Sequence, residues 1–222
     1  MPRRPRLAAG DLAYHVLNRR VGRLPLFDKS ADYAVFEKVL AEAHAQTGIR
    51  IAAYRLMPNH WHLLLWPRQD GELSEVLRWM TVTHTQRWHA HHHTAGTGPV
   101  YQGRFKSFPV QTGTFFDGRA VCGAQCVAGE AGGPGGGLAV VEWVATGTRG
   151  SELTTWLSAW PMERPRDWEA RVNRSETASE LEALRLSVQR GRPFDAEAWV
   201  RRMATRFGLE STMRARGRPR ES

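Results

Sequence analysis

Two histidines, His60 and His62, are separated by a single residue within the segment MPNHWHLLL at positions 57–65. Apolar residues on both sides of Pro58-Asn59 predict two β-strands joined by a tight turn, with the histidines opening the second strand. Residues two apart on a strand point to the same face, so the two imidazoles can chelate one divalent cation. The same spacing also occurs by chance on an ordinary polar strand face, and spacing alone leaves both interpretations open.

Four strands and two helices are predicted around this pair. Strands are expected at 13–19, 51–56, 60–66 and 100–110, and helices at 29–47 and 73–89. The order strand, helix, strand, strand, helix, strand is typical of a ferredoxin-like α+β fold, a split βαβ antiparallel sheet with two helices covering one face. The apolar faces of the helices repeat at helical spacing, at Tyr33, Phe36, Val39, Leu40 and Ala43, and at Leu73, Val76, Leu77, Met80 and His84.

Two further helices form a predicted C-terminal helical extension. The first begins at Thr177, where Thr177-Ala178-Ser179-Glu180 has the form of a capping box, and ends before Gly191. The second runs over 195–207 and ends at Gly208. Because their connection is short, we expect these two helices to pack against each other.

Charge and composition favour a polyanionic partner. The net charge is +9, and the basic residues comprise 28 Arg and only 3 Lys, a bias that suits phosphate contacts and equally suits a GC-rich genome. No apolar stretch approaches about 18 residues, so no membrane span is expected. The basic start of the chain lacks an apolar export segment, so we expect a cytoplasmic, nucleoid-associated protein. Cys122 and Cys126 are expected to form neither a disulfide nor a zinc site.

Two segments have the composition of nucleic-acid contacts. Residues 102–108, QGRFKSF, alternate basic and aromatic side chains, which could offer cations to phosphates and rings to bases, although half-buried strands look similar. The tail at 214–220 contains Arg-Gly-Arg-Pro, the core of minor-groove AT-hook peptides. As a plain basic tail it would bind DNA without sequence preference.

Histidines are dense near the end of the second helix, at His84, His89, His91, His92 and His93. Consecutive histidines on a helix do not share a face, and a flexible Gly-containing loop follows. A solvated helix end is therefore favoured here over a second metal site.

The segments at 57–64 and 101–107, with the early Tyr14-His15-Val16, resemble the REP-associated tyrosine transposases, which belong to the HUH single-strand nucleases. The resemblance covers about residues 2–112, and the part from 161 to 219 is similar to the C-terminal part of the same family. It implies a Mg or Mn ion held by His60 and His62, which polarises the scissile phosphate of single-stranded or hairpin DNA. A tyrosine then attacks, which forms a 5′-phosphotyrosine and frees a 3′-OH so that strands can be rejoined.

The resemblance also implies roles for other residues. Asn59 would orient or hydrate the ion site, Arg104 and Lys106 would hold the DNA backbone, and the basic ends would grip the hairpin through Arg3, Arg4, Arg6, Arg216 and Arg218.

The chain departs from the family where the nucleophile is expected. A Tyr-x-x-x-Asn helix should follow the strand, near Val121-Cys122, but the four tyrosines, Tyr14, Tyr33, Tyr54 and Tyr101, all come earlier. Residues 117–150 instead hold ten of the 21 glycines, and each glycine disfavours a helix by about 1 kcal/mol. We therefore divide the chain into a core at 1–112, an aberrant Gly-rich segment at 113–150 and the extension at 151–222.

Two compensating frameshifts, through natural decay or an error in the gene sequence, would explain the break. Residues 121–127 can be back-translated so that the next reading frame encodes Tyr-Val-Glu-Arg-Asn-Ala, which has the missing motif. Codons at 121–127 that cannot encode this motif would refute the hypothesis. The predicted consequence is DNA binding without cleavage. The alternatives are a non-catalytic regulator that binds DNA hairpins and a metal-dependent RNA-binding factor. The oligomeric state is left open.

Overall fold

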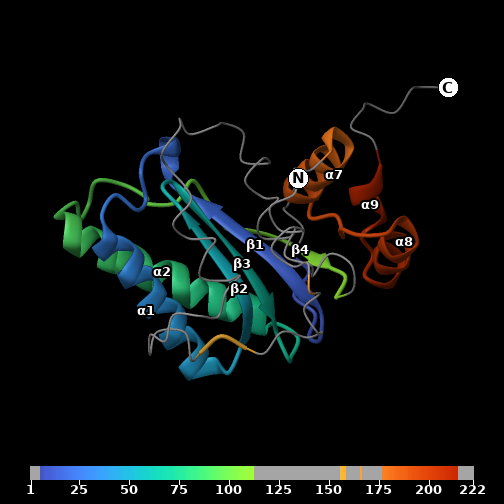
Figure 1. The fold of residues 1–222 in the computed structure, drawn as a ribbon, viewed down its shortest axis with the longest axis horizontal. Helices are drawn as coiled ribbons and strands as arrows, with labels where there is room; N and C mark the ends of the chain where they lie inside the picture. Colours follow the sequence, from blue (N-terminus) through green and yellow to red (C-terminus); the bar gives the residue numbers. More distant parts are fainter. Residues whose placement is uncertain (1–5, 113–155, 159–165, 167–176, 215–222) are drawn as a thin grey trace.

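The computed structural model describes residues 6–112, 156–158, 166 and 177–214 of the chain. A four-stranded sheet forms its centre, with strand order β2-β3-β1-β4 and every neighbouring pair antiparallel. Helices α1 and α2 lie together on one face of this sheet (Figure 1). The fold is therefore α+β with the split βαβ order predicted from the sequence. The strands are β1 (Ala13–Arg19), β2 (Arg50–Met57), β3 (His60–Trp66) and β4 (Lys106–Val110), and the helices are α1 (Ser30–Thr47) and α2 (Glu72–His92).

Alternation along β3 divides its residues between two environments. Trp61, Leu63 and Leu65 belong to the main core beneath the helices, together with residues of α1 and α2 such as Phe36 and Leu77. His60, His62 and Leu64 point to the opposite face because successive strand residues alternate. The pairing of β3 with β1 and β2 on either side thus places the histidines in the middle of the sheet.

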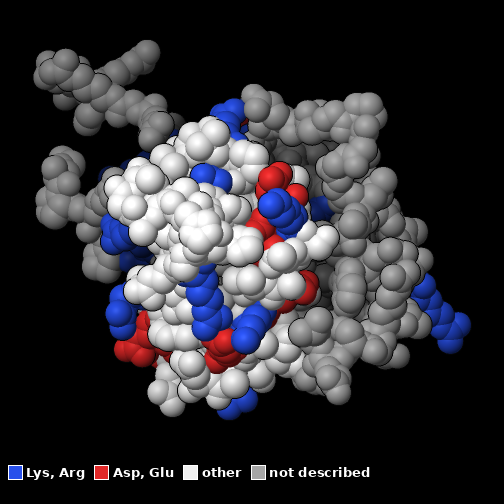
Figure 2. Space-filling view, turned by 90° about the vertical axis from the view of Figure 1, so that its left-hand side faces the viewer, with Lys and Arg blue, Asp and Glu red and all other residues white. Residues whose placement is uncertain are grey.

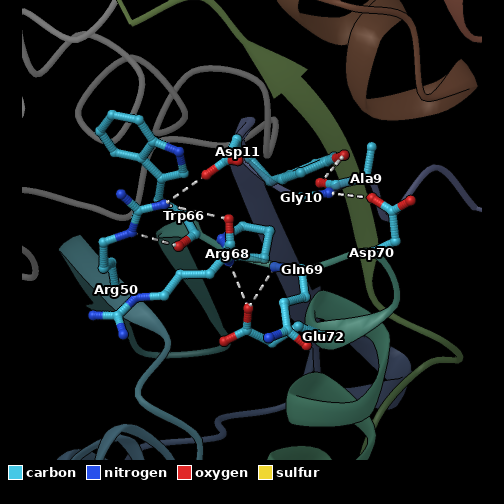
Figure 3. A network of polar contacts seen from close by, with 11 residues as sticks. Ala9, Gly10, Asp11, Arg50, Trp66, Arg68, Gln69, Asp70 and Glu72 are labelled. Carbon is cyan, nitrogen blue, oxygen red and sulfur yellow. Dashed lines mark hydrogen bonds and ion pairs between the residues drawn. The ribbon is translucent and has the colours of Figure 1, made fainter.

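A polar network ties the segment before β1 to the turn between β3 and α2 (Figure 3). The amide of Gly10 donates to Asp70 Oδ1 at 2.7 Å, and a carboxylate oxygen of Glu72 accepts from the amides of Arg68 and Gln69 at 2.5 and 3.1 Å. A Cβ at Gly10 would lie 2.6 Å from the carbonyl oxygen of Arg68, so only glycine fits this approach. The network fixes the start of β1, the strand beside the histidine pair.

Two predicted boundaries in the core were wrong. Helix α2 continues to His92 rather than ending at 89, with His93 in the left-handed conformation at φ 53°. The strand expected at 100–110 is shortened to β4, since residues 102–104 bend at Gly103 and only Tyr101 forms an isolated bridge, to Arg20. The other predicted strands and helix α1 agree with the structure within about two residues.

The C-terminal helices are α7 (Ala178–Arg190), α8 (Glu197–Arg206) and the short α9 (Glu210–Met213). The predicted capping box of Thr177 and Glu180 is present, and Gly191 ends α7 in the left-handed conformation. The expected packing of the two long helices on each other is not the main contact of either: α7 packs mainly against β4, and α8 packs mainly against α9. Leu184 of α7 belongs to a second, smaller core with Leu64 and Phe108, on the histidine face of the sheet.

No helix among the described residues is both long and apolar enough to cross a membrane. A three-residue stretch at 156–158 pairs with the edge strand β2, where the amide of Ser158 donates to the carbonyl of Ile51 at 3.0 Å. The Gly-rich segment at 113–150, with the hypothesis of a displaced reading frame, lies outside the described residues, and the division into three parts stays a prediction.

Candidate metal and nucleic-acid site

The histidine pair lies on the sheet face opposite α1 and α2. His60 is 4% exposed and His62 is 1% exposed, and their ring centroids are 4.9 Å apart. The predicted tight turn at Pro58-Asn59 joins β2 to β3, so His60 is the first residue of its strand and pairs with Met57. The structure thus brings the two imidazoles side by side, as the spacing predicted.

Asn59 determines which nitrogen of His60 carries the proton. Nδ1 of His60 is hydrogen-bonded to the side-chain oxygen of Asn59, and the Asn59 amide nitrogen donates to the carbonyl of Arg23 at 3.4 Å. A carboxamide oxygen can only accept, so Nδ1 must be the protonated nitrogen of a neutral ring. Nε2 of His60 is therefore unprotonated and has a free lone pair, which is the form in which an imidazole binds a metal.

His15 of β1 contacts His62 in a way that the sequence did not reveal. Its Nε2 lies 2.9 Å from Nδ1 of His62, and both rings are buried. When Nδ1 of His62 donates in this bond, Nε2 of His62 is also unprotonated and has a free lone pair. The motif Tyr14-His15-Val16 carried part of the family resemblance, but only the strand register shows that His15 faces His62.

Three imidazole nitrogens on this face are buried without a hydrogen-bond partner: His15 Nδ1, His60 Nε2 and His62 Nε2. Burial lowers the pKa of His60 to about 4, with a further contribution from the nearby Arg19 and Arg55, and lowers that of His15 to about 3. Burial, followed by the neighbouring histidines and arginines, also lowers the pKa of His62 well below its usual value. All three rings are therefore neutral at pH 7 and able to act as ligands.

The unpartnered Nε2 atoms of His60 and His62 fit a divalent cation, because such an ion would satisfy both at once. Among the described residues, no carboxylate, thiolate or third imidazole completes a group of three metal ligands with this pair. Within this part of the chain the pair is thus a partial ligand set that leaves coordination positions for an oxygen donor.

Two arginines flank the pair on the neighbouring strands. Arg19 of β1 lies directly opposite His60, and Arg55 of β2 lies directly opposite His62. Directly paired residues of antiparallel strands share a face, so both guanidinium groups belong to the histidine face. Arg55 is 4% exposed and Arg19 is partly buried. No local sequence pattern points to either arginine, since their placement depends on strand register.

Lys106, a predicted DNA contact, is also on this face. Leu17 of β1 pairs with both His62 and Lys106, which places Lys106 two strands from His62, about 10 Å away. Arg104 is exposed in the bend before β4, and Arg6 lies over the ring of Phe105 at 4.5 Å. The predicted contacts Arg3, Arg4, Arg216 and Arg218 lie outside the described residues.

The expectation that the rings of the 102–108 segment face bases is wrong. Phe105 is 8% exposed and belongs to the main core, while Phe108 is 1% exposed and packs against His15 and Phe194. Both basic side chains of this segment, Arg104 and Lys106, are exposed, whereas both rings are buried.

All four tyrosines lie among the described residues, and all are part of the core beneath α1 and α2 or pack against it. The hydroxyl of Tyr14 donates to Ala9, that of Tyr54 to Glu37, and that of Tyr101 is bonded to His84 and Trp61. Burial raises the pKa of each of these three phenols well above its usual value, and also raises that of the partly buried Tyr33. Each tyrosine is therefore separated from the histidine pair by the sheet.

The positive charge is not concentrated at the end of the molecule where α1 begins and α2 ends. Lys and Arg side chains there are interspersed with Asp and Glu and with uncharged surface (Figure 2). This end of the molecule is therefore not a uniformly basic surface.

Comparison with known proteins gives a family match for this core. The family described as "Transposase IS200 like" matches residues 8–115. Among solved structures, the chain is similar to a REP-associated tyrosine transposase bound to a REP hairpin, at 20% identity over 50% of this chain and 62% of that chain, with a TM-score of 0.39. A putative transposase from Deinococcus radiodurans R1 is similar at 16% identity over 50% of this chain and 87% of that chain, also with a TM-score of 0.39. The chain thus spans less than two thirds of the first structure, and the comparison with curated proteins gave no match.

Proposed function

This chain belongs, through residues 8–115, to the IS200-like transposase family, and we propose that it binds single-stranded or hairpin DNA with a divalent cation but does not cleave it. The observation that carries the proposal is the contrast between the two sheet faces. One presents two unpartnered imidazole nitrogens beside two arginines, and the other holds every tyrosine of the chain.

His60 and His62 would hold the cation through their Nε2 atoms. Asn59 keeps the proton of His60 on Nδ1, and His15 can accept the Nδ1 proton of His62, so the Nε2 atoms of both rings are unprotonated. Of Mg and Mn, imidazole ligands favour Mn. A bound ion would supply Lewis-acid polarisation of a phosphate oxygen.

Arg19 and Arg55 make binding of a cation alone unfavourable, because they place positive charge beside the same imidazoles. A phosphodiester would offset this repulsion and could contribute the oxygen ligand that the described residues lack. Cation and DNA should therefore bind cooperatively, each raising the affinity for the other. Lys106, exposed on the same face, would contact an adjacent phosphate.

Cleavage would require a hydroxyl nucleophile close to the bound phosphate. The four tyrosine hydroxyls are on the other side of the sheet, and no Tyr-x-x-x-Asn motif occurs near Val121-Cys122, where it is expected. Removing a covalent nucleophile eliminates the chemical step and leaves binding in place. The family reaction of strand cleavage and transfer is therefore proposed to be lost in this copy.

The test uses a 3′-labelled DNA stem-loop with single-stranded flanks, the full chain and Mn2+, because a 5′-phosphotyrosine would keep the 3′ part of the strand on the protein. A native gel should show a retarded band that weakens steeply as salt increases, and a denaturing gel should show no protein-linked DNA. Chelation of Mn2+ or the double substitution His60→Gln/His62→Gln should weaken the band, whereas His93→Gln, an exposed histidine on α2's end, should not.

Two outcomes would overturn parts of this proposal. A covalent adduct would refute the loss of cleavage. A retarded band whose intensity depends neither on Mn2+ nor on the histidine substitutions would refute the ion site. A matched RNA stem-loop that competes better than the DNA would favour the alternative of an RNA-binding factor, since the described residues offer no contact specific to a 2′-OH.

A further inference from the structure

A second cluster of metal-binding side chains lies in the helix layer, where α1 begins and α2 ends. Asp32 Oδ1 is 3.2 Å from Nε2 of His92 and 3.8 Å from Nε2 of His91. One ligand atom from each of the three residues lies within 4.8 Å of the other two. Both helix ends lie at the left of Figure 1, and that end of the molecule faces the viewer in Figure 2.

The histidines of this cluster are dense in the sequence, where a solvated helix end is favoured over a metal site, but Asp32 is not part of that pattern because it is 60 residues from His92. The consecutive histidines were expected to point in different directions into solvent. They meet at one carboxylate because α2 continues through His92, where its last turn passes the N-terminus of α1.

The carboxylate of Asp32 is oriented by the backbone. Its Oδ2 accepts from the amides of Asp28 and Lys29, both at 2.9 Å, and this leaves Oδ1 directed at the imidazoles. Burial alone would raise the pKa of Asp32, but these amide bonds and the nearby His92 lower it overall, so the group is ionised at pH 7. A ligand held by such outer contacts needs little reorganisation on binding an ion.

The two imidazoles differ in mobility. The ring of His92 stacks on Trp88 at 4.1 Å between centroids, and the indole of Trp88 donates to the carbonyl of Leu26 at 3.1 Å. The side chain of His91 is 51% exposed. One imidazole is thus fixed with the carboxylate, while the other is free to adjust and leaves a route for an ion from solvent.

We propose that Asp32, His91 and His92 form a second metal site that binds one Zn2+ ion, with water in the remaining position, and clamps the end of α2 to the start of α1. Two imidazoles and a carboxylate are a common zinc ligand set. Bonds of about 2.0–2.1 Å in a tetrahedral site separate ligand atoms by about 3.3 Å, which Asp32 and His92 already satisfy at 3.2 Å. This site does not depend on the proposed DNA-binding function.

The test compares Zn2+ uptake by metal-stripped full chains that differ only at the helix end. His91→Gln/His92→Gln should bind one Zn2+ fewer per chain than the unsubstituted protein in isothermal titration calorimetry, and it should lose a Zn2+-dependent rise in melting temperature. His93→Gln is the matched control, since it removes a neighbouring exposed histidine and should keep both properties. Any Zn2+ bound at His60 and His62 is common to all variants and cancels in the comparison.

Asp32→Asn tests the site without removing an imidazole. The amide oxygen can still accept from the backbone amides, but the negative ligand is lost, so the affinity should fall at least about tenfold. Should the double histidine variant not fold, the single substitution of the exposed His91 replaces it, with the same loss of affinity expected. Equal Zn2+ uptake by the protein and its His91/His92 variants, or an equal loss in His93→Gln, would overturn the site.

Discussion

The two faces of the sheet are built from alternate residues of the same strands, yet the polar groups at their centres differ in hydrogen bonding. Beneath α1 and α2, the indole of Trp61 donates to the hydroxyl of Tyr101, which in turn is bonded to Nδ1 of His84. Because an indole only donates, the tyrosine must donate to the histidine, and each of these buried groups is satisfied. On the other face, His15, His60 and His62 each retain a buried nitrogen without a partner.

An unsatisfied buried polar group destabilises a fold by about 1–3 kcal/mol. Three unpartnered imidazole nitrogens on one face therefore lower the stability of the fold, and packing gives no reason for them. A bound cation would satisfy two of the three. The face beneath α1 and α2, which holds Trp61, Leu63 and Tyr101, is therefore the stability face, and the face that holds His15, His60 and His62 is the ligand face.

Truncation of Leu63, on the stability face, should lower the free energy of unfolding most. Leu63 is fully buried in the main core beside Trp61, and Leu63→Ala is expected to lower the free energy of unfolding by about 2–5 kcal/mol. The adjacent His62→Gln, on the other face, should change it by about 1 kcal/mol or less, since the buried ring already leaves one nitrogen unpaired. Urea unfolding monitored by circular dichroism measures both. Equal losses would contradict the division between faces.

Tyr101→Phe should remove the hydrogen bonds that link Trp61, Tyr101 and His84 without affecting the ligand face. Trp61 Nε1 and His84 Nδ1 would both lose their partner, so the free energy of unfolding should fall by about 1–3 kcal/mol. The DNA gel shift at a temperature where the variant is folded should be unchanged. Loss of DNA binding in this variant would show that Tyr101 contributes to the ligand face as well as to stability.

The free energy of unfolding should also depend on pH through His84, which lies on the stability face. Burial lowers the pKa of His84 from 6.5 to about 4, with smaller contributions from nearby charges. The unfolded chain takes up this proton below about pH 6.5 while the folded chain does not, so stability is full above 6.5 and falls as pH drops towards 4. The slope is up to about 1.4 kcal/mol per pH unit.

His84→Gln keeps an acceptor for Tyr101 and removes the titration. Its unfolding free energy, measured from pH 7 to pH 4.5, should therefore decline less steeply than that of the unsubstituted protein. Parallel curves would show that His84 is not held neutral in the folded state.

The smallest effect is expected for the ion pair between the two helices. Arg87 binds Glu42 through two contacts, the shorter at 2.7 Å, and both side chains are partly exposed. Because solvent screens such pairs, Arg87→Gln should cost less than about 1 kcal/mol, and added salt should reduce the difference further. A loss as large as that of Leu63→Ala would mean that charge rather than packing holds the helix layer together.

Local patterns predicted the elements, and their failures have physical causes. The 3.6-residue repeat located α1 and α2, and the Pro58-Asn59 turn located β3, because these signals are contained within a few residues. The end of α2 was missed because its left-handed C-cap is His93, not the glycine that usually marks a helix end. The strand before β4 was predicted too long because its alternation continues through the bend at Gly103.

The candidate site was only half predictable for a different reason. His60 and His62 are close in sequence, so their shared face followed from strand geometry. His15, Arg19 and Arg55 join them through the pairing of β1 and β2 with β3, which no local pattern specifies. The same holds for Asp32 and the histidines at the end of α2, which only the packing of α1 on α2 brings together.

The central claim is that His60 and His62 bind one cation through their unpartnered nitrogens, and Mn2+ binding monitored by electron paramagnetic resonance tests it directly. The unsubstituted protein should sequester one Mn2+ ion per chain in the presence of a single-stranded oligonucleotide, with weaker binding when the oligonucleotide is absent. His60→Gln/His62→Gln should leave this Mn2+ free in solution, and His93→Gln should behave as the unsubstituted protein. Oligonucleotide-dependent Mn2+ uptake that persists in the double variant, with the fold intact, would show that His60 and His62 do not hold this ion.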